Sequence, residues 1–316
     1  MAIILSKITS IFLIMAVGFV INRLKVIPSS ATKFFVDLLL LVTTPCMILS
    51  SVTSKEFNDD TARATIEVFI CGIGFFALSF IVGYFLCKKI IKVSPKEDLG
   101  VYIMAFSTVN NGFMGFPITN AIFGSDILYL MILQNICLTL YMYSAGPFIF
   151  NINSGSGKFN IKRLLKTFCN PSTIVSIISI IMLFAGLHLP GLIFDSVTLI
   201  GDVTVPLSML VVGMQLGESN IKRIIKNKHL VIESVIKMFA LPLIMFLVVN
   251  WLPVSTDVKI TTIFAAAFPT AVVTSALAVM ENKNSLLAAE SIAFTTLISV
   301  ASIPVFALFL TGFYNV

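Results

Sequence analysis

Two polar segments rich in glycine, proline and small residues interrupt otherwise apolar stretches of this chain. Residues 107–117 read STVNNGFMGFP, and residues 265–276 read AAAFPTAVVTSA. Proline removes a backbone donor and glycine adds backbone freedom, so both weaken a helix. Backbone groups freed at bilayer depth are tolerated only against a cavity or against protein. We therefore predict a binding site here, at Asn110, Asn111, Gly112, Pro117, Pro269 and Thr270.

The chemistry expected at such breaks is anion binding. A helix that begins at a break directs unpaired N–H groups, and about half a positive charge, toward it. A carboxylate would satisfy these groups, and the side-chain amides of Asn110 and Asn111 would add donors. Gln134 and Asn135, in the next apolar segment, are further amides that could face the same cavity.

Ionisable residues and further prolines form a second group of candidates. Glu233 and Lys237 lie four apart, so on a helix they would share one face and form an ion pair. Such a pair would either hold its helix to its neighbours or act as a proton-sensitive latch. Asp202, four residues before Pro206, is a candidate for ion coupling. Pro45 and Pro206 predict helix breaks outside the binding site.

The composition requires a membrane around these segments. Of the 316 residues, 58% are hydrophobic and only 11% are charged, whereas soluble domains carry roughly 25% charged residues. This excludes a soluble globular enzyme. A bilayer core about 30 Å thick needs roughly 20 apolar residues per helix, while outer-membrane strands would alternate in segments of about ten. We predict an all-α polytopic membrane protein with ten transmembrane helices. Their expected bounds are 2–22, 30–51, 62–87, 98–123, 126–150, 169–188, 192–217, 229–250, 258–280 and 285–313.

The basic residues predict the orientation of these helices. The loops after the first, third, fifth, seventh and ninth helices hold 16 of the 21 Lys and Arg residues. Basic loops stay in the cytoplasm, so both termini should be extracytoplasmic in the plasma membrane. The net charge of +6 then follows from topology, without a nucleic-acid partner.

Matching residues in the two halves predict an internal repeat. Residues 42–49 and 203–210 share the pattern V-T-x-P-x-x-[IM]-L, and Glu67 matches Glu233. Phe-Pro pairs occur at 116–117 and at 268–269. Five helices per half require opposite orientations, as in transporters built from inverted repeats. We expect a first repeat at 1–150, a cytoplasmic linker at 151–167 and an inverted second repeat at 168–316.

The sequence contains no motif for catalysis or for a cofactor. Walker A, GxSxG and HExxH patterns are absent, and the five cysteines show no CxxC or Cys/His grouping. We therefore expect no enzymatic activity, no cofactor and no metal site. The expected partners are the lipid bilayer and a small substrate.

The sequence resembles the auxin efflux carrier family, which includes bacterial malate-permease-like proteins and the plant PIN-type auxin exporters. The resemblance covers the whole chain, and it is strongest at 110–117, at Thr44-Pro45, at 206–213 and at 268–271. It implies a fold like that of bile-acid sodium symporters, in which helices four and nine cross as broken helices. Helices one, two, six and seven would form a scaffold that can also dimerise, and the others a moving transport unit.

The resemblance also assigns roles to single residues. Asn110 falls where the plant exporters have a substrate-facing asparagine, and Pro269 falls at the crossing in helix nine. Val109 stands where the plant proteins have proline, and Thr270 replaces their polar amide. The resemblance therefore implies the fold but not auxin as the substrate.

Together these observations predict a secondary transporter of a small organic anion, a mono- or dicarboxylate such as malate, that works by alternating access. A proton or the membrane potential would drive it, and sodium is suggested only by the wider fold. Export of an indolic or aromatic acid is the alternative substrate class. A channel and a membrane sensor are the alternatives from other functional classes.

Overall fold

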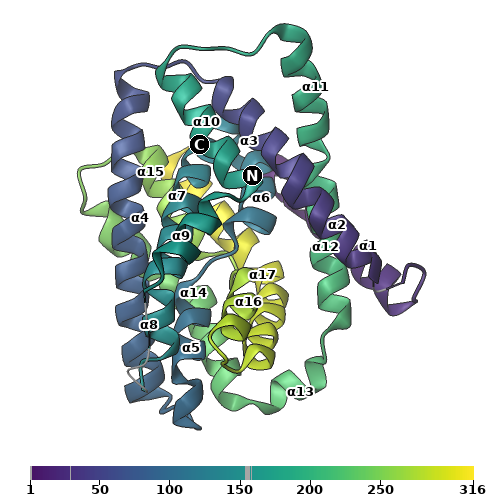
Figure 1. The fold of residues 1–316 in the computed structure, drawn as a ribbon, viewed down its shortest axis with the longest axis vertical. Coiled ribbons are helices and arrows are strands. Elements are labelled where there is room, and N and C mark those ends of the chain that lie inside the picture. Colours follow the sequence, from purple (N-terminus) through teal and green to yellow (C-terminus); the bar gives the residue numbers. More distant parts are fainter. Residues whose placement is uncertain (1, 29, 154–156, 158) are drawn as a thin grey trace.

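The computed structural model describes residues 2–28, 30–153, 157 and 159–316, and every regular element in these ranges is helical (Figure 1). Seven stretches in this part of the chain are long and apolar enough to cross a membrane. The protein is therefore a multi-pass membrane protein. The seven stretches are Leu5–Arg23, Ala31–Thr53, Asp59–Ile90, Ser125–Ser144, Gly191–Glu218, Lys228–Asn250 and Ser285–Tyr314.

The elements alternate between long helices and short ones. Up to residue 150 they are α1 (Ala2–Arg23), α2 (Ser30–Leu38), η1 (Leu39–Thr43), α3 (Thr44–Thr53), α4 (Asp59–Phe85), η2 (Leu86–Ile90), η3 (Lys96–Asp98), α5 (Leu99–Ser107), η4 (Asn111–Gly115), α6 (Phe116–Phe123), α7 (Ser125–Ser144) and α8 (Gly146–Phe150). Beyond it they are α9 (Ile161–Phe168), α10 (Pro171–Phe184), α11 (Gly191–Asp202), α12 (Thr204–Glu218), α13 (Ile221–Lys226), α14 (Lys228–Asn250), α15 (Thr256–Ala266), α16 (Val273–Met280) and α17 (Ser285–Tyr314).

Each predicted span coincides with one helix or with a run of consecutive helices. Three of them are not among the seven long apolar stretches. The sixth is α10, which has only 14 residues. The fourth and the ninth are interrupted near their middles, between α5 and η4 and between α15 and α16.

Two short helices lie where the sequence indicated only loops. Residues 154–156 and 158 of the predicted linker lie outside the described residues, but α9 occupies 161–168, where a flexible linker was expected. Its apolar residues are spaced i, i+3, i+4, i+7, which is the pattern of an amphipathic helix. Helix α13 has a similar spacing at Ile221, Ile224 and Ile225.

The helical geometry changes at Pro45 and at Pro206. Pro45 has no N–H to bond four residues back and lies in the first turn of α3, and the π-helical turn η1 immediately precedes that helix. Pro206 lies in the first turn of α12, just after α11 has ended at Asp202. Neither proline lines the crossing of the two interrupted segments.

The helices pack in two groups. In the first group, α1 packs along α12, and α3 packs against α10 and α11. A Cβ atom at Gly213 would lie 2.0 Å from the Met15 carbonyl oxygen, so α1 and α12 approach each other closely. In the second group, α4 packs against α5 and α7, while α14 packs against α15 and α17. In Figure 1, α4 lies at the left and α1, α11 and α12 lie at the right.

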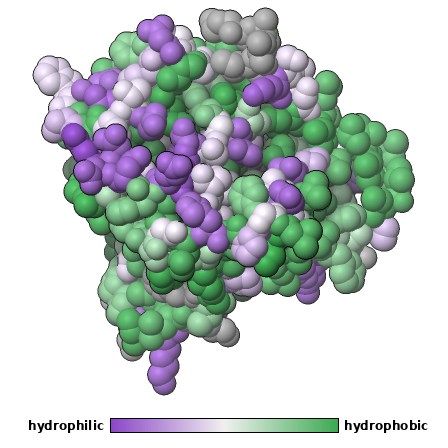
Figure 2. Space-filling model, turned by 90° about the horizontal axis from the view of Figure 1, so that it is seen from above, coloured by the Kyte–Doolittle hydropathy of each residue, from purple (hydrophilic) through white to green (hydrophobic). Residues whose placement is uncertain are grey.

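The burial pattern is that of a protein in lipid. Ile66, Ile70 and Ile73 form one face of α4 and are more than 60% exposed, and Leu192 of α11 is 82% exposed. Hydrophobic side chains therefore cover the outside, as the bilayer requires. Figure 2 shows hydrophilic residues concentrated on part of one end of the molecule and hydrophobic residues over the lobes around it. Buried polar residues occur at both interruptions, among them Thr108, Asn110, Asn111, Thr270 and Thr274.

Candidate functional site

The two interruptions are short non-helical stretches between half-helices. Helix α5 ends at Ser107, and the backbone of Thr108 is extended. After Asn110 the chain resumes as η4 and then as α6, with Pro117 in the first turn. Helix α15 ends at Ala266, and α16 begins only at Val273. Each segment is thus divided into short helices on either side of a non-helical stretch.

The two interruptions contact each other through main chain and side chain. The backbone N–H of Asn110 donates to the carbonyl oxygen of Pro269 at 2.8 Å. The hydroxyl groups of Thr108 and Thr274 are 2.9 Å apart. Polar groups of one break therefore form hydrogen bonds with groups of the other, and such bonds lower the energetic cost of non-helical backbone inside a membrane.

Asn110 lies at the point where two cavities meet. Its side chain is 3% exposed, and its amide oxygen accepts a hydrogen bond from the Phe113 N–H at 3.2 Å. Its amide nitrogen has no partner among the described residues. Asn110 and Val272, the residue just before α16, line both cavities. A buried donor and the start of a half-helix thus face the same space.

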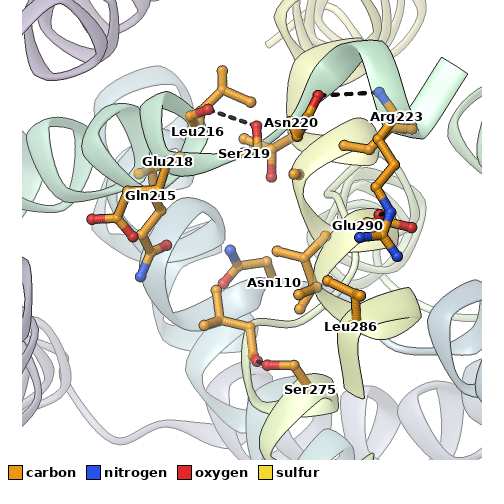
Figure 3. A pocket seen from close by; sticks show the side chains of 17 residues that line it. Asn110, Gln215, Leu216, Glu218, Ser219, Asn220, Arg223, Ser275, Leu286 and Glu290 are labelled. Atoms are coloured by element: carbon orange, nitrogen blue, oxygen red, sulfur yellow. Dashed lines mark hydrogen bonds and ion pairs between the residues drawn. The ribbon is translucent and has the colours of Figure 1, made fainter. Parts of the chain in front are cut away.

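The larger cavity, of about 490 Å³, lies between α12 and α17 (Figure 3). Asn110 and Ser275 lie at one side of it, and Arg223 and Glu290 lie at another. Its remaining polar lining residues are Gln215, Glu218, Ser219, Asn220 and Thr296. The smaller cavity, of about 120 Å³, lies among η1, α3, α7 and α10, and Asn111, Gly112 and Asn135 line it. Small polar molecules could therefore approach Asn110 from both sides.

Lys237 of α14 holds the end of helix α5. Its fully buried ammonium group donates to the carbonyl oxygens of Ala105 and Thr108, both at 2.6 Å, and to the Thr270 hydroxyl at 2.8 Å. Thr270 donates its own proton to the Ala105 carbonyl at 2.7 Å, so it can only accept from the lysine. Three acceptors require three N–H donors, which is the charged form of lysine. The negative end of the α5 dipole stabilises that charge.

The expected ion pair between Glu233 and Lys237 is not formed. The described ion pairs are Arg63–Glu67, Arg223–Glu290 and Lys55–Asp126, and none joins these two residues. Glu233 is fully buried on the same helix, accepts from the Ser234 hydroxyl at 3.2 Å, and leaves Oε1 without a partner among the described residues. The physical reason is that two carbonyl oxygens at the end of α5 and the Thr270 hydroxyl of the other interruption together accept all three N–H donors of Lys237.

The other predicted residues occupy different surroundings. Asn111 is fully buried, and neither atom of its amide has a described partner. Asn135 lines the smaller cavity, but Gln134 lies on another face of α7, against Gly72 of α4, and is not among the residues that line either cavity. Successive residues of a helix point about 100° apart, so only one of these two amides can face the cavity. Asp202 is exposed at the end of α11, away from both cavities.

The sequence indicated nothing about Arg223 and Glu290. The Arg223 Nε atom lies 2.9 Å from Glu290 Oε1, and both residues line the larger cavity. In the sequence Arg223 is one of the basic loop residues, and no motif includes Glu290. No local pattern shows that a loop and a helix start meet, because 66 residues separate them and only the fold brings them together.

A further polar cavity, of about 560 Å³, lies at the opposite end of the molecule. Lys55, between α3 and α4, forms an ion pair there with Asp126 in the first turn of α7. Partial burial lowers the pKa of Lys55, and the nearby Asp257 carboxylate opposes this shift. In the described structure this cavity is lined by no residue of the two interruptions. Only the cavities at the other side reach Asn110.

Comparison with known proteins adds to this geometry. A sequence model described as a membrane transport protein matches residues 3–307. The chain belongs to this family of membrane transport proteins, which confirms the resemblance to auxin efflux carriers. An uncharacterized transporter of Methanocaldococcus jannaschii is 23% identical over 297 residues, which cover 92% of this chain and 93% of the relative. An uncharacterized transporter of Methanothermobacter thermautotrophicus is 23% identical over 302 residues, which cover 95% of this chain and 96% of the relative.

Proposed function

We propose that this membrane transporter carries small organic anions, mono- or dicarboxylates such as malate, by alternating access. The observation that carries the proposal is the amide nitrogen of Asn110, a buried donor without a described partner at the junction of two cavities. A carboxylate oxygen is the acceptor that this donor lacks. The first turn of α16, preceded by Val272, would add backbone N–H groups and a favourable dipole.

The packing supports the proposal of two inverted five-helix repeats. If the halves are exchanged, α1 corresponds to α10 and α12 to α3, and both pairs, α1 with α12 and α10 with α3, are in contact. In the same way α4 corresponds to α14 and α7 to α17, and α4 packs against α7 as α14 packs against α17. The contact of α15 with α7 likewise corresponds to that of α5 with α17. Exchanging the halves of the chain thus reproduces these contacts, which is what an approximate twofold axis would produce. The ten-span topology follows if α10 and the two interrupted segments also cross the bilayer.

The distribution of basic residues supports an orientation. The segment between α4 and α5 and helix α13 together carry seven basic residues, and both lie toward the bottom of Figure 1. With this end in the cytoplasm of a plasma membrane, both termini are extracytoplasmic. The cavity that reaches Asn110 then opens inward, and the cavity lined by Lys55 faces outward without reaching the site. The group containing α1 and α12 would be the scaffold, through which two copies could pair.

The contacts of Lys237 favour a proton over sodium as the coupling ion. Carbonyl and hydroxyl oxygens at a helix end are the ligands that a sodium ion would use, and the lysine ammonium already occupies them. Glu233, buried with one oxygen atom lacking a described partner, is the carboxylate that a transported proton would reach. We therefore expect transport that depends on a pH gradient and not on sodium.

Purified protein in proteoliposomes tests the proposal. Solid-supported-membrane currents and radiolabel counterflow are measured with malate, lactate, citrate and indole-3-acetate, with and without proton and sodium gradients. We expect saturable transport of at least one acid, at least about tenfold slower in Asn110→Ala, since a lost hydrogen bond to a charged group costs about 1.5–3 kcal/mol. Counterflow distinguishes a carrier from a channel and also detects electroneutral exchange.

The matched control is Asn120→Ala. Asn120 lies on α6, in the same interrupted segment, and lines neither cavity at the crossing. This variant should transport like the wild type. Wild-type flux in Asn110→Ala, or equal losses in both variants, would refute the assignment of the site. Transport of none of the four acids in either assay would overturn the proposed substrate class.

A further inference from the structure

The larger cavity has an unusual distribution of charge for an anion pathway. Among its described lining residues Arg223 is the one basic side chain, and Glu218 and Glu290 are the acidic ones. Glu218 is held by hydrogen bonds from Thr32, at 3.2 Å, and from Asn22, at 3.4 Å. Arg223 is therefore the one described side chain in this lining that attracts an anion, and Lys226 is a second basic residue in the adjoining cavity.

Arg223 lies where the cavity at Asn110 adjoins a second, outer space. A cavity of about 330 Å³ adjoins the cavity at Asn110, and Arg223, Leu286 and Glu290 line both cavities. Figure 3 shows the two side chains meeting at the edge of the inner cavity, across from Asn110. An anion that passes between these two spaces must pass the guanidinium group.

The bond between Arg223 and Glu290 leaves the guanidinium group able to bind another anion. The Nε atom of Arg223 lies 2.9 Å from Glu290 Oε1, and the side chain of Arg223 is 59% exposed. No other side-chain hydrogen bond of Arg223 occurs within the described structure. An exposed ion pair of this kind contributes about 1 kcal/mol or less, whereas a carboxylate can bind the guanidinium fork through two parallel hydrogen bonds.

The backbone that presents Arg223 is fixed. The Asn220 side chain caps the start of α13 by accepting from the Arg223 N–H at 3.2 Å. Helix α13 connects α12, in the first packing group, to α14, in the second. The guanidinium group is thus held at the boundary between the two groups, at the end of the cavity opposite Asn110.

The opposite end of the molecule shows a corresponding arrangement. Lys55 follows α3 as Arg223 follows α12, and its partner Asp126 lies at the start of α7 as Glu290 lies in the first turns of α17. Both pairs line polar cavities, of about 560 and 490 Å³. A carrier that alternates between two openings needs a recognition group at each, and the two pairs lie close to the ends of corresponding helices in the two halves of the chain.

We infer that Arg223 is the anion-recognition residue of this entrance, and that Glu290 and the carboxylate of the substrate compete for its guanidinium group. The inference rests on the proposed transport of organic anions. An arriving carboxylate displaces Glu290 from Arg223, and Glu290 returns when the anion moves on to Asn110. Arg223 therefore determines that the cargo is an anion, while Glu290 prevents the anion from remaining at the entrance.

Opposite shifts in KM distinguish competition from a purely structural ion pair. The probe is the acid that the wild type transports fastest among malate, lactate, citrate and indole-3-acetate, supplied from the α13 side. Arg223→Gln should raise KM about tenfold, since the lost charge-assisted bonds are worth more than about 1.4 kcal/mol. Glu290→Gln should lower KM about threefold, because the competitor is gone. If the ion pair were purely structural, KM would change in the same direction in both variants.

Controls keep the outcomes separate. Lys222→Gln removes one positive charge from the neighbouring position of α13, where the side chain is exposed and lines neither cavity, and should leave KM unchanged. Arg223→Lys should fall between the wild type and Arg223→Gln, and it serves if the glutamine variant fails to fold. If KM shifted in the same direction in Arg223→Gln and Glu290→Gln, or in neither, the inference would be wrong, whereas the proposed transport through Asn110 would be unaffected. Absence of transport in the wild type would instead overturn the proposed function.

Discussion

Replacing Lys237 with methionine tests how the crossing is held together. Methionine has a similar volume but no donor, so the Thr108 carbonyl oxygen loses the lysine that donates to it. The Ala105 carbonyl keeps the hydrogen bond from Thr270. An unsatisfied buried carbonyl costs about 1–3 kcal/mol, and buried Glu233, which does not contact Lys237 but interacts with its charge electrostatically, would lose that nearby cation, which raises the total to about 3–5 kcal/mol. We expect a loss of about 4 kcal/mol.

A loss of stability of this size is measurable as a decrease in the melting temperature. One kcal/mol shifts the midpoint by about 2–4 °C in domains of 150–250 residues, so Lys237→Met should melt roughly 8–16 °C lower. A thiol-reactive dye is the suitable probe, because Cys71, Cys87 and Cys137 are buried free thiols that unfolding exposes. Trp251, the one tryptophan, is 88% exposed and would report little.

A second variant separates the two contributions. Adding Glu233→Gln to Lys237→Met removes the uncompensated charge, so the double variant should recover about half of the loss and melt above the single variant. Lys228→Met, at the exposed start of the same helix, is the control and should melt with the wild type. If Lys237→Met melts within 2 °C of the wild type, or the double variant is no more stable than the single one, this account of the crossing is wrong.

Two further predictions concern helix packing and the opposite entrance. Gly213→Ala would place a Cβ 2.0 Å from the Met15 carbonyl oxygen and should lower the free energy of unfolding by at least about 1–3 kcal/mol. At Gly74 a Cβ would meet nothing within 4 Å, so the control Gly74→Ala should melt at or above the wild type. Equal melting temperatures for the two variants would contradict the close approach of α1 and α12. Lys55→Gln removes the partner of Asp126 and should raise KM only for acid supplied from the side where α4 begins. The measurement compares vesicles of both protein orientations. Equal shifts of KM from both sides would refute a role for this lysine at one entrance.

Sequence reasoning located the interruptions because their signal is local. The residues Asn, Gly and Pro between 110 and 117 cannot continue a regular helix, and the structure breaks the helix just before Asn111. The same reasoning failed for the Glu233–Lys237 pair. Spacing of four residues shows that two side chains share a helix face, but it says nothing about competing partners on other helices. Lys237 instead donates to the carbonyl oxygen of Ala105 on α5, which lies 132 positions earlier in the sequence.

Side chains next to each other in sequence also separate in the structure. Gln134 and Asn135 were equivalent candidates, and only the packing of α7 against α4 placed Asn135 at the cavity and Gln134 against Gly72. The rotation of a helix about its axis depends on all of its neighbours. The hydrophobic pattern of a nearly uniform apolar segment leaves that rotation undetermined, because every face is apolar.

The sequence by itself determined that this chain lies in a membrane, where its helices break, and which family it belongs to. These properties depend on composition and on short runs of residues, and the bilayer enforces them without reference to tertiary contacts. The tertiary structure decided that the two breaks touch, that Lys237 binds the end of α5, and that Arg223 meets Glu290 at the cavity. Each of these contacts joins residues far apart in the chain, so each depends on packing that no local pattern specifies.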